Sequence, residues 1–255
     1  MLRDIMNRLT VVSMTPLVPF VKRVNQIRAI LDLNDDSQFP IPFMMHSVKI
    51  LSWNCRRVGK ERFQRAFEDI LRAHKLEIVV LMETKVPSSQ LGNFFSHLSL
   101  TMSEKVEPVG GASELWLMWD PTLVTISIHQ SIAQVIHAHI SRLDFDEWLF
   151  LVIYSSLNPS NRDHLWDNLS QVRDNYSHGW MAASDLNDFS STLERRGRHI
   201  DHCNITRKFR ERINKCELID LGYNGPRLTW NNKRKGLTNT KIRLNKALAN
   251  TQWTS

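Results

Sequence analysis

The chain has 255 residues with 42% hydrophobic content, enough for one substantial domain with a buried core, and a formal net charge of +7. Its three cysteines form no CxxC pair, which argues against a disulfide framework and favours a reducing compartment, nuclear or cytoplasmic. No apolar run reaches the roughly 18 residues that a membrane span requires, so we expect no membrane partner.

The first 44 residues have no clear functional pattern. Residues 10–21 are fairly apolar, but Pro16 and Pro19 interrupt them, and no small-residue cleavage pattern follows the basic start. We interpret residues 1–44 as a poorly ordered leader or upstream extension. The domain itself is expected to span residues 45–255.

Strand and helix patterns alternate from His46 onward. Residues 48–53 predict a strand, and residues 62–74 predict a helix with one apolar face at 3.6-residue spacing. Residues 78–82 are a continuous apolar run of strand length, which is typical of a strand buried on both faces. Residues 88–100 carry a second apolar stripe at helical spacing, and we expect a helix there.

The second half of the chain continues the alternation. The helix expected at 161–173 turns four side chains inward: Leu165, Trp166, Leu169 and Val172. The last expected helix begins with Asn204 as its cap and buries Ile205, Phe209 and Ile213. Strands are predicted at 114–119, 123–129, 132–140, 148–154, 179–183 and 227–231, and helices at 161–173 and 204–215. Helices interspersed with strand meanders predict an α/β or α+β fold in which helices cover sheets.

Three short polar motifs each end an apolar run. They are Ser52-Trp53-Asn54-Cys55, Leu81-Met-Glu-Thr-Lys85 and Ser184-Asp-Leu-Asn-Asp188. Asn54, Glu83, Asp185 and Asn187 would together form an oxygen-rich, acidic site of the kind that Mg²⁺ prefers. On position alone, a strand-end carboxylate in water is the favoured interpretation of Glu83, and Asp185 with Asn187 could be a simple turn.

The ordered series of motifs resembles the endonuclease/exonuclease/phosphatase superfamily, and most closely the endonuclease domain of plant LINE-type (non-LTR) retrotransposons. The resemblance covers residues 49–253 and rests on the following segments. They are Lys49-Ile-Leu-Ser-Trp-Asn-Cys-Arg56, Leu81-Met-Glu-Thr-Lys85, Gly110-Gly111 before Leu115-Trp116, Arg162-Asp-His-Leu-Trp166, Glu194-Arg-Arg-Gly197, Leu218-Ile-Asp-Leu-Gly222, Gly225-Pro226, Leu228-Thr-Trp-Asn231 and Arg243-Leu-Asn-Lys-Ala-Leu-Ala-Asn250. It implies a four-layer α-β-β-α sandwich of two packed mixed sheets, with the active site at one rim.

The resemblance also implies roles for individual residues. Asp185 matches the catalytic aspartate, Asn187 the asparagine that orients the transition state, and Glu83 the metal-binding glutamate for Mg²⁺ or Mn²⁺. Asn54 matches the asparagine that holds the metal site or phosphate, and Tyr154 the tyrosine that contacts phosphate. Possible nucleic-acid contacts are Arg56, Asn158, Trp230, Asn231 and Arg243. Ser184 replaces the family glycine, and this would strain the backbone if a positive φ were needed there.

Two departures from the family pattern argue against full activity. The aspartate that orients the catalytic histidine is replaced by Asn245, and the histidine segment and last core strand would lie beyond Ser255. The chain is therefore expected to be a weak or inactive DNA-nicking endonuclease and a monomer. The alternatives are a non-catalytic nucleic-acid-binding module and a degenerate fragment.

The positive charge is concentrated in the C-terminal quarter. Residues 195–255 carry 15 Lys/Arg against 4 Asp/Glu, whereas residues 1–194 carry 18 against 22. Concentrated positive charge favours polyanions through counterion release, so DNA is the expected partner. A solvated basic helix with a tail would produce the same count.

Overall fold

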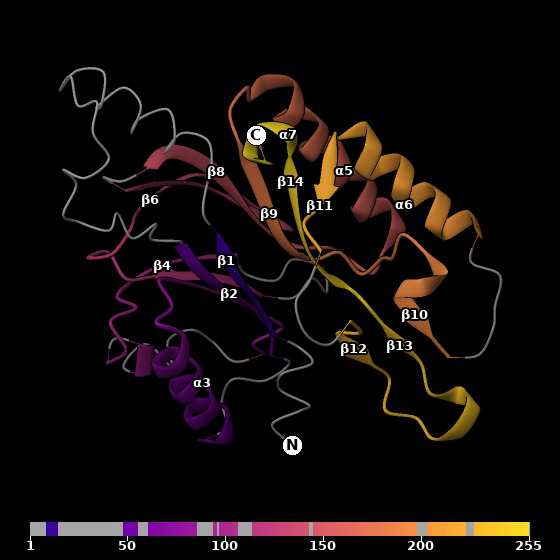
Figure 1. Cartoon of the computed structure of the whole chain (residues 1–255), viewed down its shortest axis with the longest axis horizontal. Helices are drawn as coiled ribbons and strands as arrows, with labels where there is room; N and C mark the ends of the chain where they lie inside the picture. The colour runs from indigo at the N-terminus through magenta and orange to yellow at the C-terminus, as the bar shows by residue number, and fades with distance from the viewer. Residues whose placement is uncertain are drawn as a thin grey trace, which may run out of the picture.

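The computed structural model describes residues 9–14, 48–55, 61–85, 94–95, 97–106, 114–142, 145–197, 203–222 and 227–254. Two mixed sheets lie face to face, with helices on their outer sides (Figure 1). This arrangement confirms the predicted four-layer sandwich. Among the described residues, no helix is long and apolar enough to span a membrane.

The first sheet has five strands in the order β1-β2-β3-β5-β4. Their bounds are Leu9–Met14, Val48–Asn54, Ile78–Met82, Leu115–Trp119 and Met102–Val106, in the same order. Strands β2 and β3 are parallel, and the other pairs are antiparallel. Because β2 and β3 are parallel, Asn54 lies opposite Met82, and Glu83 follows it at the same edge.

The second sheet has six strands in the order β11-β14-β9-β8-β7-β6. Their bounds are Leu218–Asp220, Asn245–Asn250, Trp180–Asp185, Phe145–Tyr154, Val135–Arg142 and Thr125–Ile132, in the same order. Strands β8 and β9 are parallel, so their carboxyl ends, Tyr154 and Asp185, lie opposite each other.

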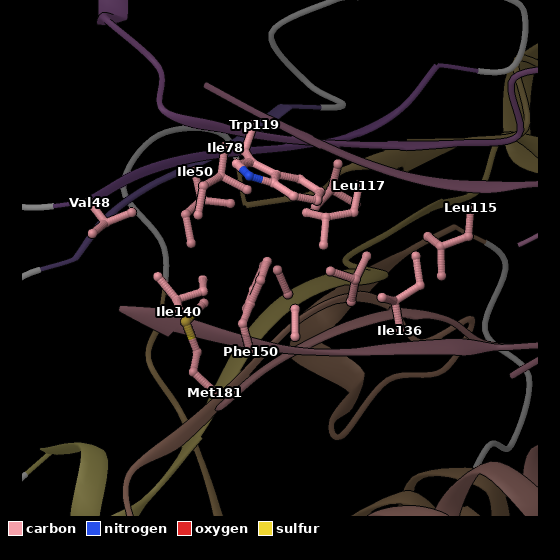
Figure 2. Packing of buried hydrophobic residues seen from close by; sticks show 14 of the residues in the cluster. Val48, Ile50, Ile78, Leu115, Leu117, Trp119, Ile136, Ile140, Phe150 and Met181 are labelled. Atoms are coloured by element: carbon pink, nitrogen blue, oxygen red, sulfur yellow. The ribbon is translucent and has the colours of Figure 1, made fainter. Parts of the chain in front are cut away.

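The main core fills the space between the two sheets. Ile50, Ile78 and Leu117 of the first sheet face Ile136, Phe150 and Met181 of the second, as Figure 2 shows. This cluster is almost completely buried, and burial of apolar area is the main favourable term in folding. It holds the two sheets, and with them the two halves of the candidate site, in a fixed relation.

Helices cover the outer face of each sheet. Helix α3 (Glu61–His74) packs Phe63 and Phe67 against Trp53 of β2. Helices α5 (Pro159–Asn175) and α6 (Cys203–Lys215) cover the second sheet, with Trp166 and Phe209 in edge-to-face contact. The short helix α7 (Thr251–Thr254) follows β14.

A small sheet extends from the second sheet beside the rim. It contains β10 (Arg195–Arg196), β13 (Lys241–Ile242) and β12 (Trp230–Asn231), in that order. The 3-10 turns η3 (Thr192–Glu194) and η4 (Gly236–Thr238) flank it. In Figure 1 it projects away from the helices, near the point where β13 leads into β14.

Most predicted elements are present, with corrections at their ends. Helix α6 begins at Cys203, so Asn204 lies inside the helix and is not its cap. Ile205 is exposed and Thr206 is buried in its place, because the helix turns Thr206 and Phe209 toward the sheet. The strand predicted at 227–231 is only Trp230–Asn231, and most of the helix predicted at 88–100 lies outside the described residues.

The segment expected to be a leader contributes one described element. Residues 9–14 form β1, which pairs antiparallel with β2 and places Leu9 opposite Trp53. The rest of residues 1–44 lies outside the described residues. The domain start predicted near residue 45 stays a prediction.

Candidate functional site

Four of the predicted site residues lie at one rim of the sandwich. Asn54 ends β2, Glu83 follows β3, Tyr154 ends β8 and Asp185 ends β9. Each sheet contributes one parallel pair, and the carboxyl ends of parallel strands meet at the same edge. The tertiary structure thus brings together residues that are up to 131 positions apart.

The side chain of Asn54 joins the two sheets. Its Nδ2 donates to Oε1 of Glu83 at 2.7 Å and to Oδ2 of Asp185 at 2.9 Å. The hydroxyl of Tyr154 also donates to Oε1 of Glu83, at 2.9 Å. Hydrogen bonds to charged acceptors are stronger than neutral ones, so this network fixes both carboxylates relative to each other.

The donor set fits a hard divalent cation. Oδ1 of Asn54 is buried and has no hydrogen-bond partner among the described residues, so an oxygen acceptor is left over beside two carboxylates. No group of three or more His, Cys, Asp or Glu side chains converges on a metal position in the described part of the chain. Mg²⁺ is satisfied by one or two carboxylates if water and substrate oxygens complete its shell.

Two of the site residues have unusual backbone conformations. Glu83 has φ of 56° and Asn187 has φ of 48°, both in the left-handed region. This conformation costs most side chains roughly 1–2 kcal/mol, but Asn tolerates it, so the cost falls on Glu83. Lys75, Lys85, Ser99, Glu217 and Lys233 also have positive φ, so the functional interpretation rests on the hydrogen-bond network and not on the backbone conformation.

Asn187 is held close to Asp185 by a tight turn. Its backbone N–H donates to Oδ1 of Asp185 at 3.1 Å, and its Nδ2 donates to the carbonyl of Ser155 at 2.6 Å. Ser184, at the family's glycine position, is not among the residues with positive φ and lies inside β9. Its hydroxyl donates to the carbonyl of Lys246, so serine fits here without the strain that we considered.

Asn245 lies directly beside Asp185. The two residues are opposite partners in the antiparallel pair of β14 and β9. Asn245 is buried, and its backbone N–H donates to Oγ1 of Thr229 at 3.2 Å. The altered position therefore belongs to the same rim as the four residues above.

The other predicted contacts are spread more widely. Asn158 caps α5, its side chain accepting from the N–H of Ser160 at 2.9 Å. Trp230 and Asn231 belong to β12 of the small sheet and are half-buried. Arg56 lies outside the described residues.

Arg243 is part of a buried ionic cluster and not of an open surface. Its guanidinium contacts both carboxylate oxygens of Asp220 at 2.7 Å and Oε1 of Glu194 at 2.8 Å. The same oxygen of Glu194 accepts from Nζ of Lys246 at 2.6 Å. We therefore leave Arg243 out of the proposed DNA contacts.

The pKa values in this cluster move in opposite directions. Burial raises the pKa of Glu194, but Lys246 and the hydrogen bonds from Ser190 together outweigh burial and hold the pKa below its usual value. Burial lowers the pKa of Lys246, and Glu194 offsets this only in part. For Arg243, burial alone would lower the pKa, but the contacts with Asp220 and Glu194 raise it. Sequence reasoning missed this cluster, although Glu194 and Lys246 lie within two of the motif segments.

Sequence comparison finds no matching family model and no similar curated protein. Many solved structures are similar in fold, including the following three. The endonuclease domain of TRAS1, a telomere-specific non-LTR retrotransposon, is 11% identical with a TM-score of 0.58, covering 80% of this chain and 85% of that one. The AP endonuclease LMAP from Leishmania major is 15% identical, with a TM-score of 0.59 and coverage of 80% and 79%. The 3' phosphatase NExo from Neisseria, bound to product DNA, is 14% identical, with a TM-score of 0.56 and coverage of 80% and 87%.

The chain has the endonuclease/exonuclease/phosphatase fold. At these identities the likeness is one of fold, and it agrees with the sandwich predicted from the motif series. Function has to be argued from the residues at the rim.

Proposed function

We propose that this chain is a retrotransposon-derived, apurinic-endonuclease-like phosphodiesterase domain that nicks DNA slowly in the presence of Mg²⁺ or Mn²⁺. The observation that carries the proposal is the Asn54 side chain, which joins Glu83 of one sheet to Asp185 of the other. A structural strand end would not require a buried amide shared by two carboxylates.

Some rim residues would bind the metal ion, and others would position the phosphate. Glu83 and the unpartnered Oδ1 of Asn54 would hold the cation. When bound, such a cation polarises a phosphoryl oxygen and stabilises developing negative charge. Tyr154 and Asn187 would position the phosphate, and Asp185 would orient the attacking water and accept its proton.

Asn245 is the reason for expecting slow turnover. In the family pattern this position holds an aspartate, and an amide cannot supply the negative charge that stabilises an imidazolium. In the serine-protease triad the corresponding change lowers kcat by about 10⁴-fold. Because Asn245 lies opposite Asp185, the negative charge is missing directly beside the proposed catalytic aspartate.

The small sheet supports DNA as the partner. Arg195, Arg196 and residues 227–242 include seven Lys/Arg and no Asp/Glu. Concentrated positive charge beside the rim attracts the phosphate backbone of DNA independently of base sequence. A second function, DNA binding without cleavage, is favoured by the same surface together with Asn245.

Plasmid nicking tests the activity. Supercoiled plasmid should be relaxed slowly by the wild-type chain with Mg²⁺ and not after addition of EDTA. Glu83→Ala and Asp185→Ala should abolish the activity, while Glu68→Ala, on the exposed face of α3, should leave it unchanged. Nicking that persists in Asp185→Ala would overturn the assignment. No nicking by a wild-type sample with a cooperative melt would favour the binding function.

The salt dependence of binding tests the partner. Replacing Lys233, Arg234 and Lys235 with glutamine should make the slope of log K against log salt less steep by up to about 3, because each phosphate contact contributes about 0.9. A matched control replaces three exposed basic residues of α6, Arg207, Lys208 and Arg210. Equal changes in both triple variants would mean that net charge alone, and not the small sheet, sets DNA affinity.

A further inference from the structure

Gln134, in the turn between β6 and β7, holds the loop after β8 on two sides. Its Oε1 accepts from the N–H of Ser156 at 2.7 Å, and its Nε2 donates to the carbonyl of Asn161 at 2.7 Å. Its backbone carbonyl accepts from the N–H of Tyr154 at 3.0 Å. One residue thus ties the start of α5 to the strand end that carries Tyr154.

Arg162, in the first turn of α5, holds the turn after β9. Its Nη1 lies 3.3 Å from the carbonyl oxygen of Asn187 and 3.5 Å from Oδ2 of Asp188. Its Nε is buried and has no partner among the described residues. A buried donor without an acceptor costs about 1–3 kcal/mol, which offsets part of the stability gained from the ion pair with Asp188.

These contacts close into a ring through Asn187. The Nδ2 of Asn187 donates to the carbonyl of Ser155, whose neighbour Ser156 is held by Gln134. Gln134 binds the carbonyl of Asn161, and the next residue, Arg162, returns to the carbonyl of Asn187. We call this closed set of contacts the hydrogen-bond ring.

The ring fixes a residue in the left-handed region of backbone conformation. Asn187 has φ of 48°; its backbone N–H is held by Asp185 and its backbone carbonyl by Arg162. Loss of the carbonyl contact would leave the turn less constrained and would let the Asn187 amide move. In a positioned reaction, a shift of about 1 Å can cost 10²-fold in rate.

We propose that Arg162 and Gln134 are positioning residues for phosphodiester cleavage, acting through Asn187 and Tyr154. This inference rests on the proposed function of the rim. Both side chains contact backbone groups of the site loops, so they should affect turnover more than DNA binding.

The kinetic test uses Arg162→Ala in the full chain. We expect kcat for plasmid nicking to fall about tenfold or more with KM within about twofold, and millimolar guanidinium to restore part of the loss. Arg207→Ala, which loses one exposed ion pair on α6, is the matched control and should be unaffected. An unchanged kcat, or a loss that guanidinium does not rescue, would overturn the proposal.

A second measurement does not depend on activity. Amide hydrogen exchange at the Asn187 N–H should become about tenfold faster in Gln134→Ala and in Arg162→Met/Asp188→Asn, because local opening becomes easier. The double variant avoids leaving Asp188 buried without its arginine and serves if Arg162→Ala does not fold. If the wild type does not nick DNA, the proposed function fails, and hydrogen exchange alone tests whether the hydrogen-bond ring holds Asn187. Unchanged protection of the Asn187 N–H in these variants would overturn the inference that the ring holds it.

Discussion

The buried ionic cluster gives a sharp prediction, that Glu194→Gln destabilises the chain more than Lys246→Met. Lys246 is 1% exposed, and Nζ has two acceptors, Oε1 of Glu194 at 2.6 Å and the carbonyl of Arg243 at 3.5 Å. Removing Glu194 therefore leaves a buried ammonium without a carboxylate. Breaking a buried pair in this way costs about 3–5 kcal/mol, and we expect about 4 kcal/mol for Glu194→Gln.

Lys246→Met leaves Glu194 with more remaining hydrogen-bond donors than Glu194→Gln leaves acceptors for Lys246. Without Lys246, the carboxylate of Glu194 still accepts from Arg243 at 2.8 Å and from the N–H and hydroxyl of Ser190 at 2.7 and 3.0 Å. Lys246→Met also removes the cost of burying an ammonium, so we expect about 2 kcal/mol. The double variant should cost less than the sum of the two, because the residues share one contact.

The assay is urea unfolding followed by circular dichroism at pH 7, with the same m-value required for all variants. Unfolding at several pH values also tests the direction in which the free energy of unfolding changes with pH. Burial lowers the pKa of Lys246, so the unfolded chain binds its proton more tightly, and the free energy of unfolding should rise with pH between the folded and unfolded pKa values. Lys246→Met should lose that rise. A larger cost for Lys246→Met than for Glu194→Gln would refute the reasoning.

Three further predictions concern the rim. Mg²⁺ at ten times its Kd should stabilise the folded chain by about 1.4 kcal/mol in thermal melts, and Glu83→Ala should lose this shift; an equal shift in the variant would place the ion elsewhere. Asn54→Ala should raise the Mg²⁺ concentration for half-maximal nicking by about tenfold, measured by titration, because the amide that orients both carboxylates is gone. Burial raises the pKa of Asp188, so the folded chain holds this proton to higher pH and stability falls as pH rises from about 3.9 through the raised value. Asp188→Asn should flatten that part of the urea-stability profile, and an unchanged slope would contradict the assignment.

Local pattern was sufficient for the elements that are long and apolar. The run at Ile78–Met82 predicted a strand buried on both faces, and its five residues are all buried. The stripe of Leu165, Trp166, Leu169 and Val172 predicted the inward face of α5 correctly. In these segments the spacing of apolar residues matches the period of the element, so neighbours in sequence carry the signal.

Short strands were not predictable in the same way. Residues of β10 and β13 form two-residue strands that exist only because each pairs with a distant segment. Strand β14 begins with Asn245 and Lys246, two polar residues that are buried by partners elsewhere in the chain. Strand formation there depends on pairing and burial that no local window contains.

Periodicity by itself determined only an α/β or α+β fold, because the spacing of apolar residues reports single helices and strands. The sandwich and the order in which polar motifs end its strands came from the resemblance carried by motifs that are contiguous in the chain. Only the tertiary structure decided that Asn54 joins Glu83 to Asp185, and that Arg243 is enclosed by Glu194 and Asp220. These contacts join residues from 23 to 131 positions apart. Their geometry is set by the packing of two sheets, and that packing is a property of the whole core.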